Sequence, residues 1–233
     1  MNELSRRALL SGAAVTAASV LWKEPLHAQL VWKKSNWHVE EFARLLNSSR
    51  RIKQIIHTDA INGGRFLRNA KNGLNGLRFG HGVAVDQVQI VCGLNGQANV
   101  LNYSDYVWEK YRVGEWVKVN DPKTGRPALR NIFYPGKSGA PGYDSEDPSN
   151  EDSMYQDASV QALQSRGVQF VSCHTSTEEA ARALIQQNSL GAHPEEVAQD
   201  MVEHVLPGVI IVPSLAAALA VLQCEGHFSY MAA

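Results

Sequence analysis

The chain has 233 residues, a formal net charge of −1 at pH 7 and a hydrophobic content of 44%. This near-neutral balance excludes the broad basic surface with which proteins bind nucleic acid or an anionic membrane. No segment reaches the roughly 20 consecutive apolar residues of a membrane-spanning helix, and the length fits one domain with an ordinary core.

The first 28 residues have the pattern of an export signal. Arg6 and Arg7 follow a serine and precede a run of small and apolar residues over 8–22, and the segment ends at Leu26-His27-Ala28. Paired arginines before an apolar stretch and a small-residue exit are typical of a twin-arginine signal peptide. An amphipathic first helix is the alternative, but the apolar run has no charged face. We therefore expect a periplasmic or otherwise exported protein.

The first half of the remaining chain alternates helix and strand patterns. Segment 29–50 is expected as an N-terminal helical extension, with an amphipathic helix over 39–46. Two apolar segments, 51–58 and 87–92, predict strands. Helices are expected between and after these strands, over 65–79 and 104–112.

Composition changes abruptly at Lys118. From there to Ser153 the chain is rich in proline and glycine and then carries a run of acidic residues. Irregular segments of this length inside a domain are usually functional lids or mobile surface loops. The composition favours a mobile surface insertion over 118–153.

The second half returns to regular patterns. The expected helices cover 158–166, 175–188, 193–205 and 213–226, and the expected strands cover 168–173, 209–212 and 227–230. Residues Thr175 to Glu178 match a capping box at the start of the second of these helices. Strands that are nearly continuous apolar runs, alternating with helices, predict an α/β domain over 51–233. We expect a mainly parallel sheet of about five strands with helices on both faces.

Cys173 is the candidate reactive residue. It ends a predicted strand, and the carboxyl ends of parallel strands share the edge at which ligands usually bind. We expect its sulfur to face the N-terminus of the following helix, where unpaired N–H groups favour a thiolate. His174 beside it is a candidate proton acceptor or binding residue. The alternative is that Cys173 is a small residue filling the end of the strand.

Two further residues, Cys92 and His57, end the other early strands and are candidate binding residues at the same edge. The sulfurs of Cys92 and Cys173 are compatible with independent thiols, a disulfide or two metal ligands. Cys224, near the end of the last helix, is expected in the core. A mixed cysteine and histidine metal site stays an open alternative, but the histidine spacing matches no metal-binding motif, so no metal ligand is assigned. No strand is followed by a glycine-rich nucleotide motif, and the sequence predicts no cofactor.

Two stretches of the sequence resemble a known family. Residues Gly167 to Cys173 with the helix after them, and Leu206 to Pro213 with the alanine-rich helix up to Gly226, resemble DsrE-like proteins of the DsrE, DsrF and TusD type. The resemblance also covers residues 51–111. It implies a homo-oligomeric α/β fold. In the sulfur-transfer members, the cysteine that corresponds to Cys173 carries a persulfide that passes to another protein.

Two functions follow as hypotheses. The first is an exported DsrE-like protein that binds or carries sulfur through Cys173 in sulfur-compound metabolism, together with a periplasmic protein partner. The second is a non-catalytic periplasmic binding or assembly protein, with a metal-binding variant, that uses the fold as an oligomeric scaffold. Both favour a carrier or binding protein over a turnover enzyme. The cytoplasmic relay proteins of the family lack an export signal and the 118–153 insertion.

Overall fold

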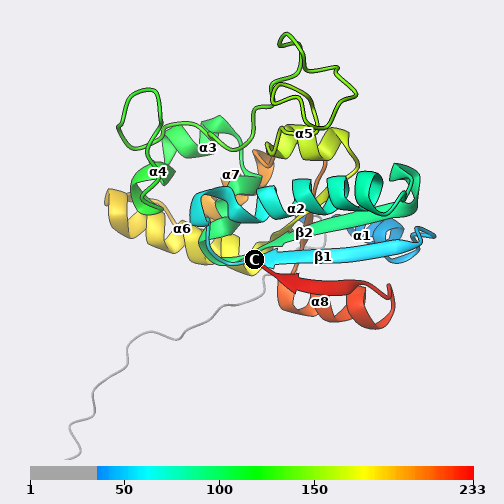
Figure 1. Cartoon of the computed structure of the whole chain (residues 1–233). Helices are drawn as coiled ribbons and strands as arrows, with labels where there is room; N and C mark the ends of the chain where they lie inside the picture. The colour runs from blue at the N-terminus through cyan, green and yellow to red at the C-terminus, as the bar shows by residue number, and fades with distance from the viewer. Residues whose placement is uncertain (1–35) are drawn as a thin grey trace, which may run out of the picture.

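The computed structural model describes residues 36–233, which form an α/β domain around one parallel sheet (Figure 1). The predicted signal peptide lies outside the described residues. The strands are β1 (Ile52–Thr58), β2 (Val88–Leu94), β3 (Gln169–Cys173), β4 (Val209–Val212) and β5 (Ser229–Ala232). They pair in the order β4-β3-β2-β1-β5, and every pairing is parallel. The predicted fold class, a parallel sheet of five strands with helices, is confirmed.

The helices lie close to their predicted positions. They are α1 (Val39–Leu46), α2 (Arg65–Asn75), α3 (Asp105–Lys110), α4 (Val113–Trp116), α5 (Val160–Ser165), α6 (His174–Asn188), α7 (Pro194–Glu203) and α8 (Leu215–Cys224). Short helical turns complete the set: η2 (Asn62–Gly64), the π turn η3 (Gly76–Gly80), η4 (Val85–Gln87) and the 3₁₀ helix η5 (Gly96–Asn102). No helix among residues 36–233 is long and apolar enough to cross a membrane.

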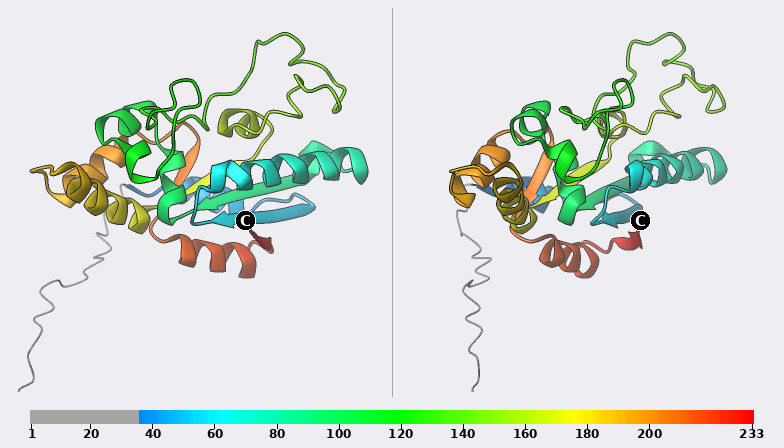
Figure 2. Two further views of the ribbon diagram at one scale, coloured as in Figure 1. Left: turned by 60° about the vertical axis from the view of Figure 1, so that its left-hand side comes forward. Right: turned by 90° about the vertical axis from the view of Figure 1, so that its left-hand side faces the viewer.

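The chain crosses the sheet in one direction and then returns beneath it. From β1 to β4 each strand pairs with the next, and the connections carry α2, α5 and α6 on one face. The step from β4 to β5 goes back across the sheet, and its helix α8 covers the opposite face together with α1. In all three views α8 lies on the side of the sheet opposite to α2 and α5 (Figures 1 and 2).

Strand alternation divides the core between these two faces. In β1, Ile56 packs in the larger cluster under α2 and α6, whereas its neighbour Ile55 packs in the smaller cluster over α8. The larger cluster contains fully buried Trp108 and Phe170. Since both faces are covered, the central strands are apolar on both sides, as the nearly continuous apolar runs predicted.

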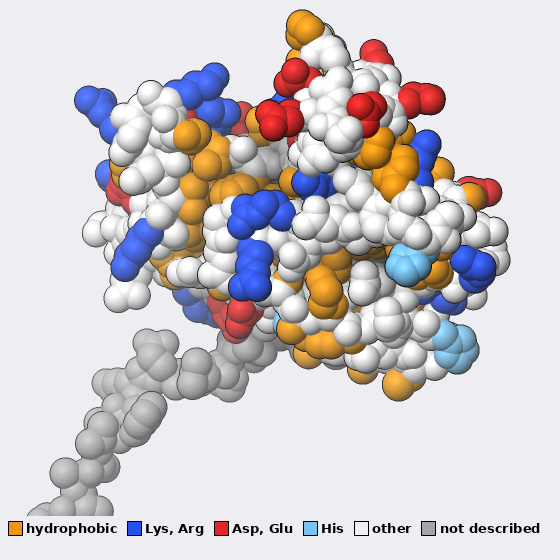
Figure 3. All heavy atoms as spheres, viewed as in Figure 1, with side chains coloured by type: hydrophobic (Ala, Val, Ile, Leu, Met, Phe, Trp, Pro, Cys, Tyr) orange, Lys and Arg blue, Asp and Glu red, His pale blue; other side chains and the backbone are white. Residues whose placement is uncertain are grey.

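The 118–153 insertion has neither helix nor strand, as expected, but part of it is anchored to the core. Asn131 is fully buried, and its Nδ2 donates hydrogen bonds of 2.9 Å to the carbonyls of both Leu101 and Tyr103. The segment then rises over α5, where Asp and Glu side chains gather on its outer turns (Figures 2 and 3). Its mobility stays a prediction.

A polar cluster inside the larger core fixes the end of β3. Asn99 of η5 is fully buried, and its Oδ1 accepts the Cys173 N–H at 3.0 Å while its Nδ2 donates to the Cys173 carbonyl at 3.2 Å. The same amide contacts the hydroxyls of Ser172 and Thr177 at 3.0 and 3.1 Å. Together with the Thr177 hydroxyl, which donates to the Cys173 carbonyl at 3.0 Å, this side chain supplies hydrogen-bond partners for the backbone where strand becomes helix.

We predict that Asn99→Ala lowers the free energy of unfolding by about 2 kcal/mol, because it leaves the buried Cys173 N–H unsatisfied and removes one of the side-chain hydrogen bonds to the Cys173 carbonyl. Urea denaturation measures the change. The exposed Asn72 on α2 provides the matched control, and Asn72→Ala should change the free energy by less than about 0.5 kcal/mol. Equal free energies of unfolding for Asn99→Ala and Asn72→Ala would show that the hydrogen bonds of Asn99 do not stabilise the fold.

Candidate functional site

Cys173 lies where the chain leaves the sheet toward opposite faces. Helix α6 follows β3 on one face and α8 follows β4 on the other, so the carboxyl ends of these neighbouring strands form the topological switch point of the sheet. In open parallel sheets, ligands bind at such a point. Cys173 was predicted at the carboxyl edge of the sheet. The structure places it at the switch point of that edge, which is the most favourable position for a ligand site.

The sulfur of Cys173 faces α8 rather than α6. Its Sγ accepts a hydrogen bond of 3.3 Å from the backbone N–H of Leu215, the first residue of α8. The prediction that it faces the following helix is wrong, because α6 packs on the other face of the sheet. Strand alternation places Cys173 on the α8 side, next to Val171 and Val212 of the smaller cluster.

This contact gives the sulfur an electropositive neighbour. The first N–H groups of a helix have no partner within the helix, and the helix dipole adds partial positive charge there. The Leu215 N–H is thus a hydrogen-bond donor to the sulfur at the start of a helix. Cys173 is only 5% exposed, so a reaction partner must be small or the surrounding segments must move.

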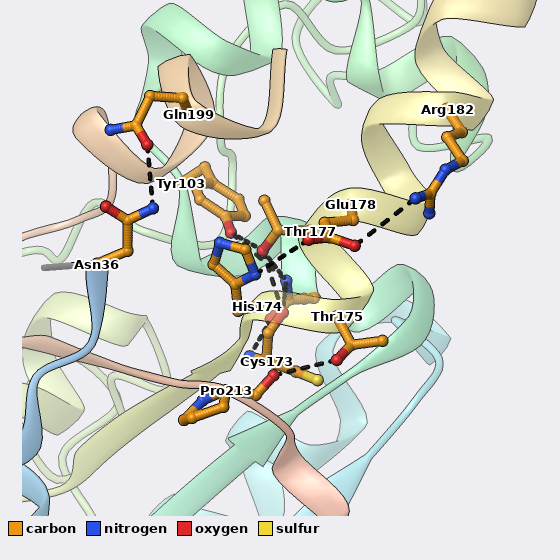
Figure 4. A network of polar contacts seen from close by, with 11 residues as sticks. Asn36, Tyr103, Cys173, His174, Thr175, Thr177, Glu178, Arg182, Gln199 and Pro213 are labelled. Atoms are coloured by element: carbon orange, nitrogen blue, oxygen red, sulfur yellow. Dashed lines mark hydrogen bonds and ion pairs between the residues drawn. The ribbon is translucent and has the colours of Figure 1, made fainter. Parts of the chain in front are cut away.

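A hydrogen bond joins the two segments that leave β3 and β4. The Thr175 side chain donates a hydrogen bond of 3.0 Å to the Pro213 carbonyl, at the exit of β4 (Figure 4). The predicted capping box at Thr175–Glu178 is therefore wrong: α6 begins at His174, and Thr175 bonds across the switch point instead of capping its own helix.

His174 points away from the sulfur. In Figure 4 its imidazole is directed toward Glu178, and Nδ1 lies 3.6 Å from Oε1 of that carboxylate. The ring is 5% exposed, and burial lowers its pKa, which favours the neutral form. No hydrogen bond joins His174 to the Cys173 sulfur within the described chain. The structure thus gives His174 a place in the site but not the contact that a proton acceptor for Cys173 needs.

The polar cluster behind Cys173 extends through Tyr103. Its hydroxyl lies 2.5 Å from Thr177 Oγ1 and 3.3 Å from Ser172 Oγ, and burial raises the pKa of this phenol. Sequence reasoning missed Asn99, Asn102 and Tyr103. Polar residues three apart inside an apolar run were the available signal, because that spacing places Asn99 and Asn102 on one face of a 3₁₀ helix.

The other predicted site residues do not join Cys173. Cys92 lies two residues before the end of β2, fully buried in the larger cluster on the opposite face, where burial raises its pKa. The two sulfurs therefore do not form a disulfide, and all three cysteines are free. Cys224 is exposed, so its expected place in the core is wrong.

His57 forms a second polar group farther along the carboxyl edge. Its Nε2 lies 2.9 Å from Oδ1 of Asn95, and its Nδ1 lies 2.8 Å from the Tyr230 hydroxyl. The histidine is therefore engaged with residues after β2 and on β5, and not with the cysteines. Within residues 36–233, no three His, Cys, Asp or Glu side chains are grouped as a metal site requires.

The chain matches no protein-family model, no curated protein and no solved structure. The resemblance to DsrE-like proteins accordingly stays a prediction from the residues that carry it.

The buried His174 predicts a pH dependence of stability. Its folded-state pKa lies below the ordinary value of 6.5, so the unfolded chain takes up the proton first as the pH falls. Stability should thus decrease below about pH 6.5, with a contribution of at most about 1.4 kcal/mol per pH unit. Denaturation of His174→Gln from about pH 7.5 to about pH 5 should give a flatter curve than the wild type. Substitution of exposed His81 by Gln should leave the slope unchanged; an unchanged slope in His174→Gln would contradict the assignment.

Proposed function

We propose that this chain is an exported DsrE-like protein that carries sulfane sulfur on Cys173. The observation that carries the proposal is the position of the Cys173 sulfur at the switch point of the sheet, 3.3 Å from the Leu215 N–H. The proposed export depends on residues 1–28, which match a twin-arginine signal. The twin-arginine route exports proteins that have already folded. This suits a parallel sheet, which folds slowly because its strand pairings join distant parts of the chain.

The chemistry needs only a nucleophilic thiolate and a small sulfur donor. The Cys173 thiolate attacks a sulfane sulfur of an inorganic polysulfide. A new S–S bond forms on Cys173 while the old one breaks, and the shortened polysulfide leaves with the electron pair. Transfer reverses this step: an acceptor thiolate attacks the outer sulfur and Cys173 leaves as a thiolate. The Leu215 N–H stabilises the thiolate before the first step and after the second. No external oxidant or reductant is consumed.

The proposal includes assembly with further copies of the chain. Strand β5 lies at one edge of the sheet, and three of its four residues are exposed. An edge strand has unpaired backbone donors and acceptors on its outer side, which another chain can pair with. The described fold thus offers a surface for the homo-oligomer that the family resemblance implies, and for a periplasmic partner.

A second candidate function has its own observation. Cys173 is 5% exposed and packs among apolar side chains, as expected for a residue that fills the end of a strand. A binding or assembly protein without thiol chemistry would have this arrangement. The two functions differ in what happens to Cys173 in the presence of a sulfur donor.

We predict that polysulfide adds about 32 Da, the mass of one sulfur atom, to Cys173 of the native protein. Intact-mass and peptide mass spectrometry measure the adduct, in a Cys224→Ser background that removes the exposed thiol. Cys173→Ala should abolish the adduct, whereas Cys92→Ala should retain it. A Cys173 that stays unmodified while a known carrier is loaded under the same conditions would favour the scaffold function.

The contribution of the Leu215 N–H is testable with a pair of substitutions. Leu215→Pro removes the N–H, and proline is well tolerated at the first position of a helix. Leu215→Ala truncates the same buried side chain but keeps the N–H. We predict that persulfide formation is roughly tenfold slower in Leu215→Pro than in Leu215→Ala, the usual effect of one hydrogen bond to a charged group. Equal rates would show that the N–H does not activate the sulfur.

A further inference from the structure

The amino edge of the sheet holds a cavity that the proposed thiol chemistry does not use. It has a volume of about 180 Å³ and lies beside β2, on the face covered by α2 and α5. Its lining is mostly apolar and includes Leu74, Val83 and Val88, together with Arg78, Tyr155 and Arg166. The opposite edge of the sheet carries Cys173, so the two places are independent.

Two guanidinium groups converge on one phenol ring at this cavity. The Cζ of Arg78 lies 5.1 Å from the ring centroid of Tyr155, and that of Arg166 lies 5.3 Å from it. Phe79 packs edge-on against the same ring at 5.0 Å. Aromatic faces attract cations, so the Tyr155 ring holds both arginines near each other despite their like charge.

The last residue of α2 fixes this arrangement. Asn75 donates a hydrogen bond of 2.7 Å to the Tyr155 carbonyl and accepts one of 2.6 Å from Arg166 Nη2. Directly after it, α2 widens into the π turn Gly76–Gly80, which carries Arg78 to the cavity. A π turn interrupts regular helix packing and is found mostly at functional sites.

The positive charge at this site has no counterpart. Within residues 36–233, no carboxylate lies within 4.0 Å of Arg78 or Arg166. Arg166 Nη1 is shielded from solvent and has no hydrogen-bond partner there. Burial lowers the pKa of the Arg166 guanidinium, and the charge of Arg78 adds to this effect. Two neighbouring guanidinium groups without a carboxylate partner favour the binding of an anion beside them.

We propose that this cavity binds a small organic carboxylate. The carboxylate accepts hydrogen bonds from the exposed Arg78 guanidinium and is attracted by the charge of Arg166, which also lines the cavity. A short apolar body then lies against Leu74, Val83 and Val88. The cavity holds about six water molecules at roughly 30 Å³ each, which suits an anion with a single small ring or a short chain. In Figure 3, hydrophobic and Lys or Arg side chains lie side by side at the carboxyl end of α2.

Benzoate and its neutral analogue benzamide test this proposal on the whole chain by NMR titration or calorimetry. We expect saturable one-site binding of benzoate in the millimolar range, as befits so small a ligand. Arg166→Gln and Arg78→Gln should each weaken binding roughly tenfold. Arg65→Gln is the matched control, because it removes the same charge from the far end of α2 and should change the affinity less than about twofold.

Three results would contradict all or part of the proposal. Benzamide binding as tightly as benzoate would overturn the proposal, since the arginines would then select nothing. Sulfate binding as tightly as benzoate would overturn the part that assigns an apolar body. Arg166 also bonds Asn75, so Arg166→Gln can reduce stability. The Arg78 side chain is exposed, so Arg78→Gln leaves the fold intact and keeps the test valid. Wild-type benzoate affinity in Arg78→Gln and in a folded Arg166→Gln would refute the site. This result does not depend on whether Cys173 carries sulfur.

Discussion

The side chain of Asn99 bonds both the N–H and the carbonyl of Cys173, and the candidate site depends on this pair of hydrogen bonds. At the end of β3 the sheet ladder stops and α6 begins without a turn, so the Cys173 N–H needs a partner inside the core. The amide of Asn99 accepts that N–H and shares the Cys173 carbonyl with the Thr177 hydroxyl. The direction of the Cys173 side chain is fixed as a consequence.

The second constraint is the reversal of the chain after β4. Because α8 must return to β5 beneath the sheet, its N-terminus begins next to the end of β3 and on the face opposite to α6. Strand alternation directs Cys173 to that face and His174 to the other. The thiol therefore meets the Leu215 N–H, and the imidazole meets Glu178 instead of the sulfur. Cys173 and His174 are neighbours in sequence, but they have different chemical surroundings because their side chains lie on opposite faces of the sheet.

The fold was largely predictable from sequence, since the strands are apolar runs and the helices have regular apolar spacing. The errors have physical causes. The strand predicted over 87–92 ends too early, since β2 continues through Gly93 to Leu94. Glycine fits there because an added Cβ would lie 3.1 Å from Leu215 Cδ1 of α8. Cys224 looked buried, but the inward face of α8 is formed by Leu215, Ala218 and Leu222. The position of Cys173 at the sheet edge was predictable, whereas its contact with α8 requires the strand order, which no local pattern contains.

We propose that the Leu215 N–H stabilises the Cys173 thiolate. The most direct measurement is the ¹H and ¹⁵N shift of the Leu215 amide, followed by NMR while the thiol is ionised by raising the pH. We expect this amide to move the most among those of the first turn of α8, and to stop moving in Cys173→Ala. A Leu215 amide that does not respond to ionisation of Cys173, or that moves equally in Cys173→Ala, would contradict the account.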